Sequence, residues 1–323
     1  MIHIHTTYSK DGLGLLEEVV KIGQNQGLDY LIFTDHDNLQ GKRDGKEGWH
    51  GKTLVLIDEE ISTKEGHYLA LRMGQKEVPR LQSPRWTIEA VSAQGALGFV
   101  AHPFWRRRPW KDLDVRGMTG LEIYNAPQDV SEENILWMGF WTIFTGSEFS
   151  LTNWLDREND AMALWDRWLS RGERVVGIGS PDAHGLRRFG FHLGPYSSLF
   201  RLVRNHLLVK EVSPAEIYRA IAQGHLFVAH DLVGEARGFV FLAVRRKSVE
   251  GVMGDEVKRG GGLKLYAYLP SPGEMALLKD GRIVAKAEGQ HGWFEVPSPG
   301  IYRLEATRKG KPWIYSNPIY VIE

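Results

Sequence analysis

The sequence Asp29-Tyr-Leu-Ile-Phe-Thr-Asp-His36 places a short apolar run directly before a carboxylate and an imidazole. A run of this length, rich in aliphatic and aromatic residues, predicts a buried strand. In the preceding segment, apolar residues recur at helical spacing from Leu15 to Gly23, and Gly27 is placed to end that helix. The stretch therefore predicts a helix followed by a strand whose end carries chemically active side chains.

The same alternation of strand and helix continues along the first two thirds of the chain. Further strands are predicted at Thr53–Ile57, Tyr68–Leu71, Leu97–Ala101, Gly120–Tyr124 and Arg174–Gly179, with helical stretches around 87–94, 158–170 and 213–223. Alternating units indicate a parallel sheet, and this many of them favour a barrel. We therefore predict an α/β domain over residues 1–232.

The pattern changes after Arg237, where short strand candidates follow one another without helices. They lie at Gly238–Val244, Leu263–Leu269, Met275–Leu278, Ile283–Ala287, Trp293–Val296, Ile301–Thr307 and Trp313–Val321. Turn signals such as Asp280-Gly281 separate them, and Asp-Gly between apolar runs is a strong hairpin signal. We predict a second, all-β sandwich domain over residues 237–323.

The composition excludes several classes of protein. The chain has 323 residues, with 40 Lys+Arg against 40 Asp+Glu, so a non-specific grip on long nucleic acid or on an anionic membrane is not expected. It has no cysteine, which excludes disulfides and thiolate metal sites. No signal peptide is visible, and the apolar patch 135–144 is about half the roughly 20 residues of a membrane span. These features predict a soluble, cytoplasmic protein.

Histidines and carboxylates fall at the ends of successive predicted strands. His3 and His5, two apart on a strand, project from one face, and the other members of the set are His36, Glu60, His67, His102, Asp182 and His184. In a parallel barrel these strand ends meet at one face, and packing gives no reason for histidine at each of them. Imidazole and carboxylate without thiol suit zinc, manganese or iron. The sequence therefore predicts a metal cluster.

These residues resemble the PHP (polymerase and histidinol phosphatase) superfamily of metal-dependent phosphoesterases. Its motifs are similar to His3-Ile-His5, Thr34-Asp-His-Asp37, Ala101-His-Pro103 and Pro181-Asp-Ala-His184, in the right order, with Glu60-Ile-Ser-Thr63 and Gly66-His67 between them. The Gly120-Leu-Glu-Ile-Tyr-Asn125 stretch and the C-terminal sandwich resemble, more narrowly, the CehA/McbA-type members. The resemblance implies a distorted (β/α)7 TIM-like barrel, followed here by a small immunoglobulin-like sandwich.

The resemblance also implies two or three divalent ions (Zn, Mn or Fe) and their ligands. One ion would use His3, His5, Glu60 and Asp182, a second would share Glu60 and add His67 and His102, and a third would use Asp11, His36 and His184. Asp11 could instead cap the helix that begins near Gly12, in which case the cluster would be binuclear.

The implied reaction is hydrolysis of a small phosphomonoester or short nucleotide by a metal-bridging hydroxide. Glu60 would fix the spacing of the ions, and Asp182 would hold or orient the water. Asp35, beside His36, would orient a ligand imidazole, or would simply close the turn with Asp37.

Arginines follow two of the motifs. Arg106, Arg107 and Arg108 come shortly after His102, and Arg187 and Arg188 follow His184. Guanidinium groups suit phosphate oxygens, so we expect at least one of them to bind substrate; a solvated surface run is the alternative for each.

Two other functions remain open at this stage. The same metal chemistry hydrolyses carbamates, amides or carboxylic esters, as the CehA/McbA resemblance implies. A non-catalytic binding module with a structural metal cluster is the other, although structural sites are usually closed and few. The expected partner is a small phosphate ester; long nucleic acid and membrane are not expected, and a homo-oligomer is compatible with the sequence.

Overall fold

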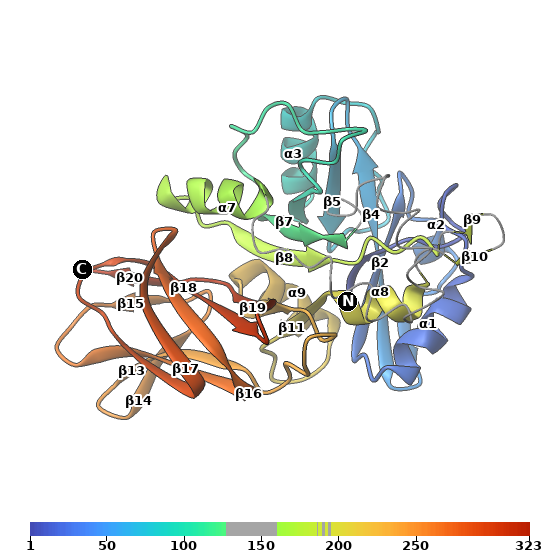
Figure 1. The fold of residues 1–323 in the computed structure, drawn as a ribbon. Coiled ribbons are helices and arrows are strands. Elements are labelled where there is room, and N and C mark those ends of the chain that lie inside the picture. Colours follow the sequence, from blue (N-terminus) through green and yellow to red (C-terminus); the bar gives the residue numbers. More distant parts are fainter. Residues whose placement is uncertain (127–159, 186, 189–190, 193–194) are drawn as a thin grey trace.

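A computed structural model of the chain describes residues 1–126, 160–185, 187–188, 191–192 and 195–323. The apolar stretch 135–144 lies outside these residues. An N-terminal mixed α/β part and a C-terminal part made of strands lie at opposite ends of the molecule (Figure 1). The described residues include no helix that is long and apolar enough to cross a membrane.

The N-terminal sheet is curled. Its strands are β1 (Ile2–Ile4), β2 (Tyr30–His36), β3 (Gly48–His50), β4 (Thr53–Ser62), β5 (His67–Leu71), β6 (Leu97–Ala101), β7 (Gly120–Asn125) and β8 (Val176–Ser180). They are ordered β1-β2-β4-β5-β6-β7-β8, with β3 paired to β4. An isolated parallel bridge between Ile4 and Ala183 links β1 to the segment after β8. The first and last strands of this order therefore lie close together.

The expected all-parallel sheet is wrong at β5. This strand pairs antiparallel with both β4 and β6, whereas β1, β2, β6, β7 and β8 make parallel pairs. The four residues between β4 and β5 are too few for a crossover helix, so the chain turns back as a hairpin. The start of β5 consequently lies at the same edge as the ends of the parallel strands.

Capping residues and glycine mark the ends of several helices. The described helices are α1 (Leu16–Asn25), α2 (Gln40–Arg43), α3 (Pro84–Ala93), α7 (Asp160–Ser170), α8 (Tyr196–Leu202) and α9 (Pro214–Gln223). In α1 the predicted apolar face is buried, and Gly27 adopts φ 67° just after the helix, as expected. The side chains of Ser83 and Ser213 cap α3 and α9, each of which has proline in its first turn.

The C-terminal sheet has ten strands. They are β11 (Arg204–Leu207), β12 (Leu226–Ala229), β13 (Val240–Arg245), β14 (Ser248–Val252), β15 (Glu256–Lys258), β16 (Leu263–Lys279), β17 (Arg282–Glu295), β18 (Gly300–Arg308), β19 (Lys311–Ser316) and β20 (Ile319–Ile322). A short pair, β9 (Arg187–Arg188) with β10 (Phe191–His192), stands apart from both large sheets. β12 pairs with β19, so this sheet includes strands that precede Arg237.

Several predicted strand boundaries are wrong. The single strand predicted at Trp313–Val321 is two strands, β19 and β20, and two pairs of predicted strands are each one strand. The segments 263–269 and 275–278 form one strand, β16, and 283–287 and 293–296 form one strand, β17. The register between β16 and β17 shifts between Tyr268 and Gly273. The segment Ser271-Pro272-Gly273, whose composition is typical of a turn, is therefore an irregularity within β16. β16 thus pairs with β13 along its first half and with β18 along its second.

Side chains join the two parts of the molecule. The Asn317 amide donates to the Gly177 carbonyl at 2.8 Å and accepts from the Gly177 N–H at 2.9 Å, as a neighbouring strand would. Arg303 of β18 makes two hydrogen bonds to the Asp166 carboxylate of α7, at 2.7 and 2.9 Å. The edge of β8 and helix α7 are therefore fixed against the C-terminal sheet.

Candidate metal centre

The structure brings together all nine side chains that the sequence analysis named as metal ligands. His3, His36 and Glu60 lie on β1, β2 and β4, while His67 opens β5. The others lie in the segments that follow strands: His5 and Asp11 after β1, His102 after β6, and Asp182 and His184 after β8. Glu60 was expected after a strand ending at Ile57; it lies instead within β4, which continues to Ser62.

One group forms around one oxygen of each of two carboxylates. The Nε2 atoms of His3 and His5 each lie 3.2 Å from Glu60 Oε2 and 3.3 Å from Asp182 Oδ1. All four side chains are buried. This is the first ligand set that the resemblance implies.

A second group forms around the other oxygen of Glu60. Glu60 Oε1 lies 3.1 Å from His67 Nδ1 and 2.9 Å from His102 Nε2, and the two nitrogens are 3.4 Å apart. The two carboxylate oxygens of Glu60 thus face two different sets of imidazoles. Such a carboxylate can bridge two ions.

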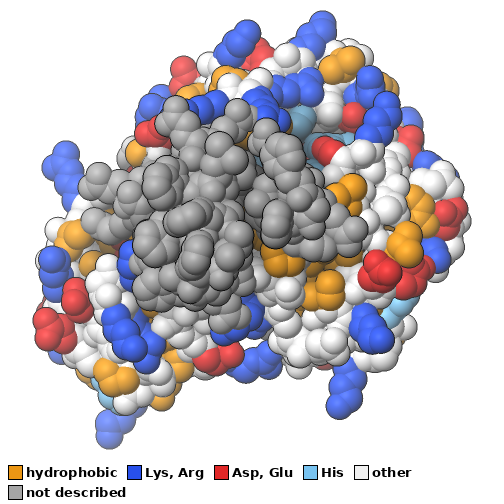
Figure 2. Space-filling model, turned by 45° about the vertical axis from the view of Figure 1, so that its right-hand side comes forward, with side chains coloured by type: hydrophobic (Ala, Val, Ile, Leu, Met, Phe, Trp, Pro, Cys, Tyr) orange, Lys and Arg blue, Asp and Glu red, His pale blue; other side chains and the backbone are white. Residues whose placement is uncertain are grey.

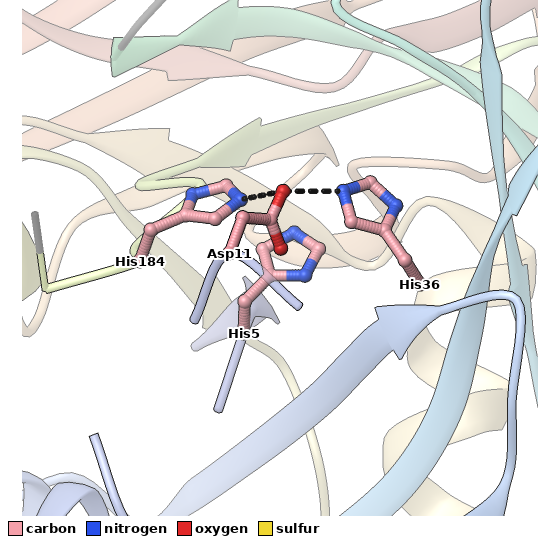
Figure 3. Close-up of side chains that lie close together, drawn as sticks. All are labelled: His5, Asp11, His36 and His184. Carbon is pink, nitrogen blue, oxygen red and sulfur yellow. Dashed lines mark ion pairs between the residues drawn. The ribbon is translucent and has the colours of Figure 1, made fainter. Parts of the chain in front are cut away.

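A third group lies toward solvent around Asp11 (Figure 3). Asp11 Oδ2 is 3.3 Å from His36 Nε2 and 3.5 Å from His184 Nε2, and the His5 ring stacks on His184 with centroids 4.1 Å apart. The other nitrogen of His36, Nδ1, lies 3.1 Å from Glu60 Oε2. Asp11 therefore points at the imidazoles rather than capping a helix, since α1 begins only at Leu16.

These separations fit shared metal ions. Two ligand atoms each about 2.0–2.1 Å from a tetrahedral ion lie about 3.3–3.4 Å apart. Within the described part of the chain, several of the facing atoms are buried without a hydrogen-bond partner: His3 Nε2, His5 Nε2, His36 Nδ1 and Asp182 Oδ1. Buried polar atoms are normally paired, so these atoms are arranged to receive a cation. The residues present fit a metal cluster.

The backbone is strained at three of these positions. His3, His102 and Asp182 have φ values of 68°, 26° and 42°, in the left-handed region that side-chain-bearing residues avoid. Such residues cost about 1–3 kcal/mol each and persist where the surrounding structure holds them. The side chains at all three positions belong to the cluster: His3 and Asp182 to the first group and His102 to the second.

The charges of the buried groups depend on one another. Burial raises the pKa of the Glu60 carboxyl, but the imidazoles of His36, His3 and His67 outweigh it and hold that pKa well below its usual range. Burial lowers the pKa of His3, yet Asp182, Glu122 and Glu60 raise it well above the usual value. In the absence of an ion, these carboxylates therefore favour the protonated form of His3, whereas burial lowers the pKa of His67. A metal ion bound there would replace the proton on His3.

Glu122 is a site residue that the sequence analysis missed. It is fully buried on β7, where Oε1 lies 2.6 Å from His3 Nδ1 and Oε2 accepts from the His102 N–H at 2.8 Å. The Asn125 amide donates to Oε2 as well, also at 2.8 Å. A glutamate within the apolar run Gly120-Leu-Glu-Ile-Tyr was the available signal. Its carboxylate fixes the orientation of the His3 ring.

Asp35 does not contact the His36 imidazole in the described structure. Its carboxylate accepts hydrogen bonds from the Thr6 N–H and hydroxyl at 2.7 and 2.8 Å, and from the Ser9 hydroxyl at 2.8 Å. Successive side chains of a strand point to opposite faces, so Asp35 and His36 diverge. Asp35 reaches the cluster through Ser9, whose Oγ is 3.2 Å from His5 Nδ1.

A basic cleft of about 590 Å³ opens beside the cluster. It is lined by Tyr8, Lys10, Asp11, His36, Asp37, Asn38, Ser62, His67, Arg80, Trp105, Arg107 and Arg108. Figure 2 shows histidine side chains in a recess beside lysine and arginine side chains. Of the cluster histidines, His36 and His67 line this cleft, whereas His3, His5 and His102 lie buried behind them.

The predicted arginines divide into three groups. Arg108 is closest to the cluster: Nη1 lies 3.3 Å from His67 Nε2, and Nη2 donates to the Thr63 carbonyl. Arg107 lines the cleft, whereas Arg106 is exposed and does not. The side chains of Arg187 and Arg188 lie outside the described part of the structure. Lys10 and Arg80, which the sequence analysis did not single out, also line the cleft.

Part of the chain matches the model of a known protein domain. A model of the PHP domain matches residues 2–161. An uncharacterized protein of Methanocaldococcus jannaschii is 30% identical over 141 residues, which cover 39% of this chain and 80% of that protein. The chain belongs to the PHP domain family. The matched part of the PHP domain includes the candidate ligands from His3 to His102, and Asp182 and His184 follow it.

Two solved structures resemble the chain more distantly. A two-domain protein from Bacteroides vulgatus, containing a predicted PHP-like metal-dependent phosphoesterase, is 15% identical, with a TM-score of 0.42, and the match covers 98% of this chain and 93% of that one. A lesion-specific endonuclease from Pyrococcus furiosus is 16% identical, with a TM-score of 0.40, over 68% of this chain and 55% of that one.

Proposed function

We propose that this PHP domain is a metal-dependent hydrolase that cleaves a small phosphomonoester or short nucleotide. The observation that carries the proposal is the convergence of nine imidazole and carboxylate side chains whose facing atoms lie 2.9–3.5 Å apart. Divalent ions bound there, such as zinc, manganese or iron, would lower the pKa of water and neutralise phosphoryl oxygens.

The chain's own residues would then divide the work. Glu60, with one oxygen toward each imidazole set, would fix the spacing of two ions. Asp182 would hold the attacking water, since its Oδ1 is directed into the cluster. The guanidinium groups of Arg107 and Arg108 would bind phosphoryl oxygens from the cleft side. Two further carboxylates would position ligands. Asp35 would act on His5 through the Ser9 hydroxyl, and Glu122 would act directly on His3.

The occupancy of the third group decides whether two or three ions bind. Asp11 has 49% of its side chain exposed, whereas Glu60 has 1% exposed. A site at the solvent edge with fewer buried ligands should bind its ion more weakly. We propose two tightly held ions and a third that is held by Asp11, His36 and His184 and exchanges more readily.

The finer description of the fold is also a proposal. The strand order and the Ile4–Ala183 bridge support a distorted seven-stranded barrel. Glu122 in the Gly120–Asn125 stretch supports the CehA/McbA-type affiliation. The division into 1–232 and 237–323 and an immunoglobulin-like second domain remain predictions.

The test is metal content together with turnover of a generic aryl phosphate, for the wild type and His102→Ala. We expect two or three ions per chain and turnover that is lost in the variant, while His50→Ala, a histidine distant from the cluster, keeps both. Bound ions without phosphatase turnover would contradict the phosphoesterase and direct the search to carbamates and carboxylic esters. A protein that binds no ion after reconstitution would overturn the hydrolase altogether.

A further inference from the structure

Trp105 lines the basic cleft next to the proposed second ion site. Its ring centroid lies 5.3 Å from that of His102 and 6.0 Å from that of His67. Hydrogen bonds hold the backbone of its loop, because the Trp105 N–H donates to the His102 carbonyl at 3.0 Å and the Arg108 N–H donates to the Trp105 carbonyl at 3.0 Å. The indole therefore lies beside the two imidazoles, on a held backbone, and lines the cleft.

The indole of Trp105 differs from those that serve packing. The buried rings of Trp110, Trp165, Trp168 and Trp313 each donate their N–H to a backbone carbonyl, at 2.6–3.0 Å. Trp105 is half-buried, and among the described residues its N–H has no hydrogen-bond acceptor. Its ring thus contacts the His67 and His102 rings and leaves surface facing the cleft.

We propose that Trp105 is a specificity-determining residue, forming an aromatic subsite that favours phosphoesters whose leaving group carries a planar ring. The subsite rests on the proposed hydrolytic function. Tyr8 also lines the cleft, so a ring bound there would have aromatic neighbours, while Arg107 and Arg108 provide for the anionic phosphoryl group. A stacked or edge-to-face pair of aromatic rings contributes beyond the burial of its area, so the gain depends on the ring of the ligand.

The size of the cleft agrees with such a ligand. Its volume of about 590 Å³ lies within the roughly 300–1,000 Å³ of small-molecule sites. Its basic lining residues are Lys10, Arg80, Arg107 and Arg108. The Asp37 carboxylate, which also lines the cleft, lies 3.7 Å from Arg80 Nη1. A substrate with one phosphoryl group and one ring therefore matches the basic and the aromatic residues of the lining.

The test compares two ligands that differ only in the ring. Phenylphosphonate and methylphosphonate cannot be hydrolysed by P–O cleavage, so leaving-group reactivity does not affect the result. Their dissociation constants are measured by calorimetry on the metal-loaded full chain, for the wild type, Trp105→Ala, Trp105→Phe and Trp86→Ala. The last is a control at an exposed tryptophan on α3.

We expect the wild type to prefer phenylphosphonate. Trp105→Ala should weaken phenylphosphonate binding by about 2- to 12-fold and leave methylphosphonate unchanged, with Trp105→Phe close to the wild type. Equal weakening of both ligands would overturn the subsite, because it would show that the ring only supports His102. No weakening of either would overturn it as well.

Failure of the subsite and failure of the proposed function are distinguishable. A wild type that binds both phosphonates equally, yet hydrolyses aryl phosphate, contradicts the aromatic subsite alone. A wild type that carries its ions, binds neither phosphonate and hydrolyses no phosphate ester contradicts both.

Discussion

The N-terminal sheet gathers carboxylate and imidazole side chains at one edge, and several of their facing atoms have no hydrogen bond within the described residues, whereas the C-terminal sheet buries Arg303 in a paired network. There the Arg303 guanidinium bonds to Asp166 and Glu305 and lies over the Trp165 ring. Buried charge therefore has two different roles in this chain. The cluster of imidazoles and carboxylates is arranged to bind a cation from solution, whereas in the C-terminal network the Arg303 guanidinium is itself the cation.

The largest effect is expected at Glu60, the carboxylate shared by two imidazole sets. Glu60→Gln removes the charge that offsets the surrounding cations, so we expect the protein to retain less than one ion per chain and to lose turnover. Because Glu60 is also the buried counter-charge of the surrounding imidazoles when no ion is bound, the melting temperature of the chelated protein should fall as well. Metal analysis measures the ion content, and differential scanning calorimetry measures the melting temperature. Full metal content in this variant would contradict the shared role of Glu60.

The opposite behaviour is expected at Arg303. Arg303→Met leaves the Asp166 and Glu305 carboxylates without their cation, which should lower the free energy of unfolding by about 3–5 kcal/mol. Metal content per folded chain should stay at the wild-type value. Denaturant unfolding measures the loss, and adding Asp166→Asn and Glu305→Gln to the same chain should restore much of it. A variant as stable as the wild type would show that the network contributes nothing.

A third expectation concerns His230, which is buried at the end of β12 where the two parts meet. Burial lowers the pKa of His230 to about 4, below the 6.5 of an exposed imidazole. The unfolded chain therefore takes up the proton first as the pH falls. The stability contributed by neutral His230 is complete above about pH 6.5 and is lost as the pH falls to about 4, by about 3 kcal/mol.

His230→Gln isolates that contribution. Glutamine does not titrate and keeps a donor for the Leu202 carbonyl, which the His230 ring contacts at 2.7 Å. The difference in unfolding free energy between wild type and variant should shrink from pH 7 to pH 4. A difference that is constant across this range would contradict the burial of a neutral imidazole.

The smallest effect is expected at Glu122, behind the ligands. Glu122→Gln keeps a polar group near His3 and His102 but removes the charge, so metal affinity should fall by about 10- to 100-fold with the stoichiometry unchanged. Competition with a chelator measures the affinity, and Glu18→Gln on the exposed face of α1 is the matched control. An unchanged affinity would show that Glu122 does not support the ligands.

The sequence identified the candidate ligands but not the residues that support them. Imidazole at the end of strand after strand is a local signal, so His36 and His102 could be placed at one edge without coordinates. The partner of His3 lies 119 residues away at Glu122, and no local pattern connects the two. Likewise, the short connection before His67 reverses the strand direction, and strand alternation turns Asp35 away from His36. These outcomes depend on tertiary pairing.

Anomalous X-ray diffraction from crystals of the metal-loaded protein tests the metal cluster most directly. We predict one anomalous peak within bonding distance of His3, His5, Glu60 and Asp182 and a second within bonding distance of Glu60, His67 and His102. Any third peak should lie at Asp11, His36 and His184. A loaded protein with no peak beside Glu60 would contradict the metal centre and the hydrolytic function that depends on it.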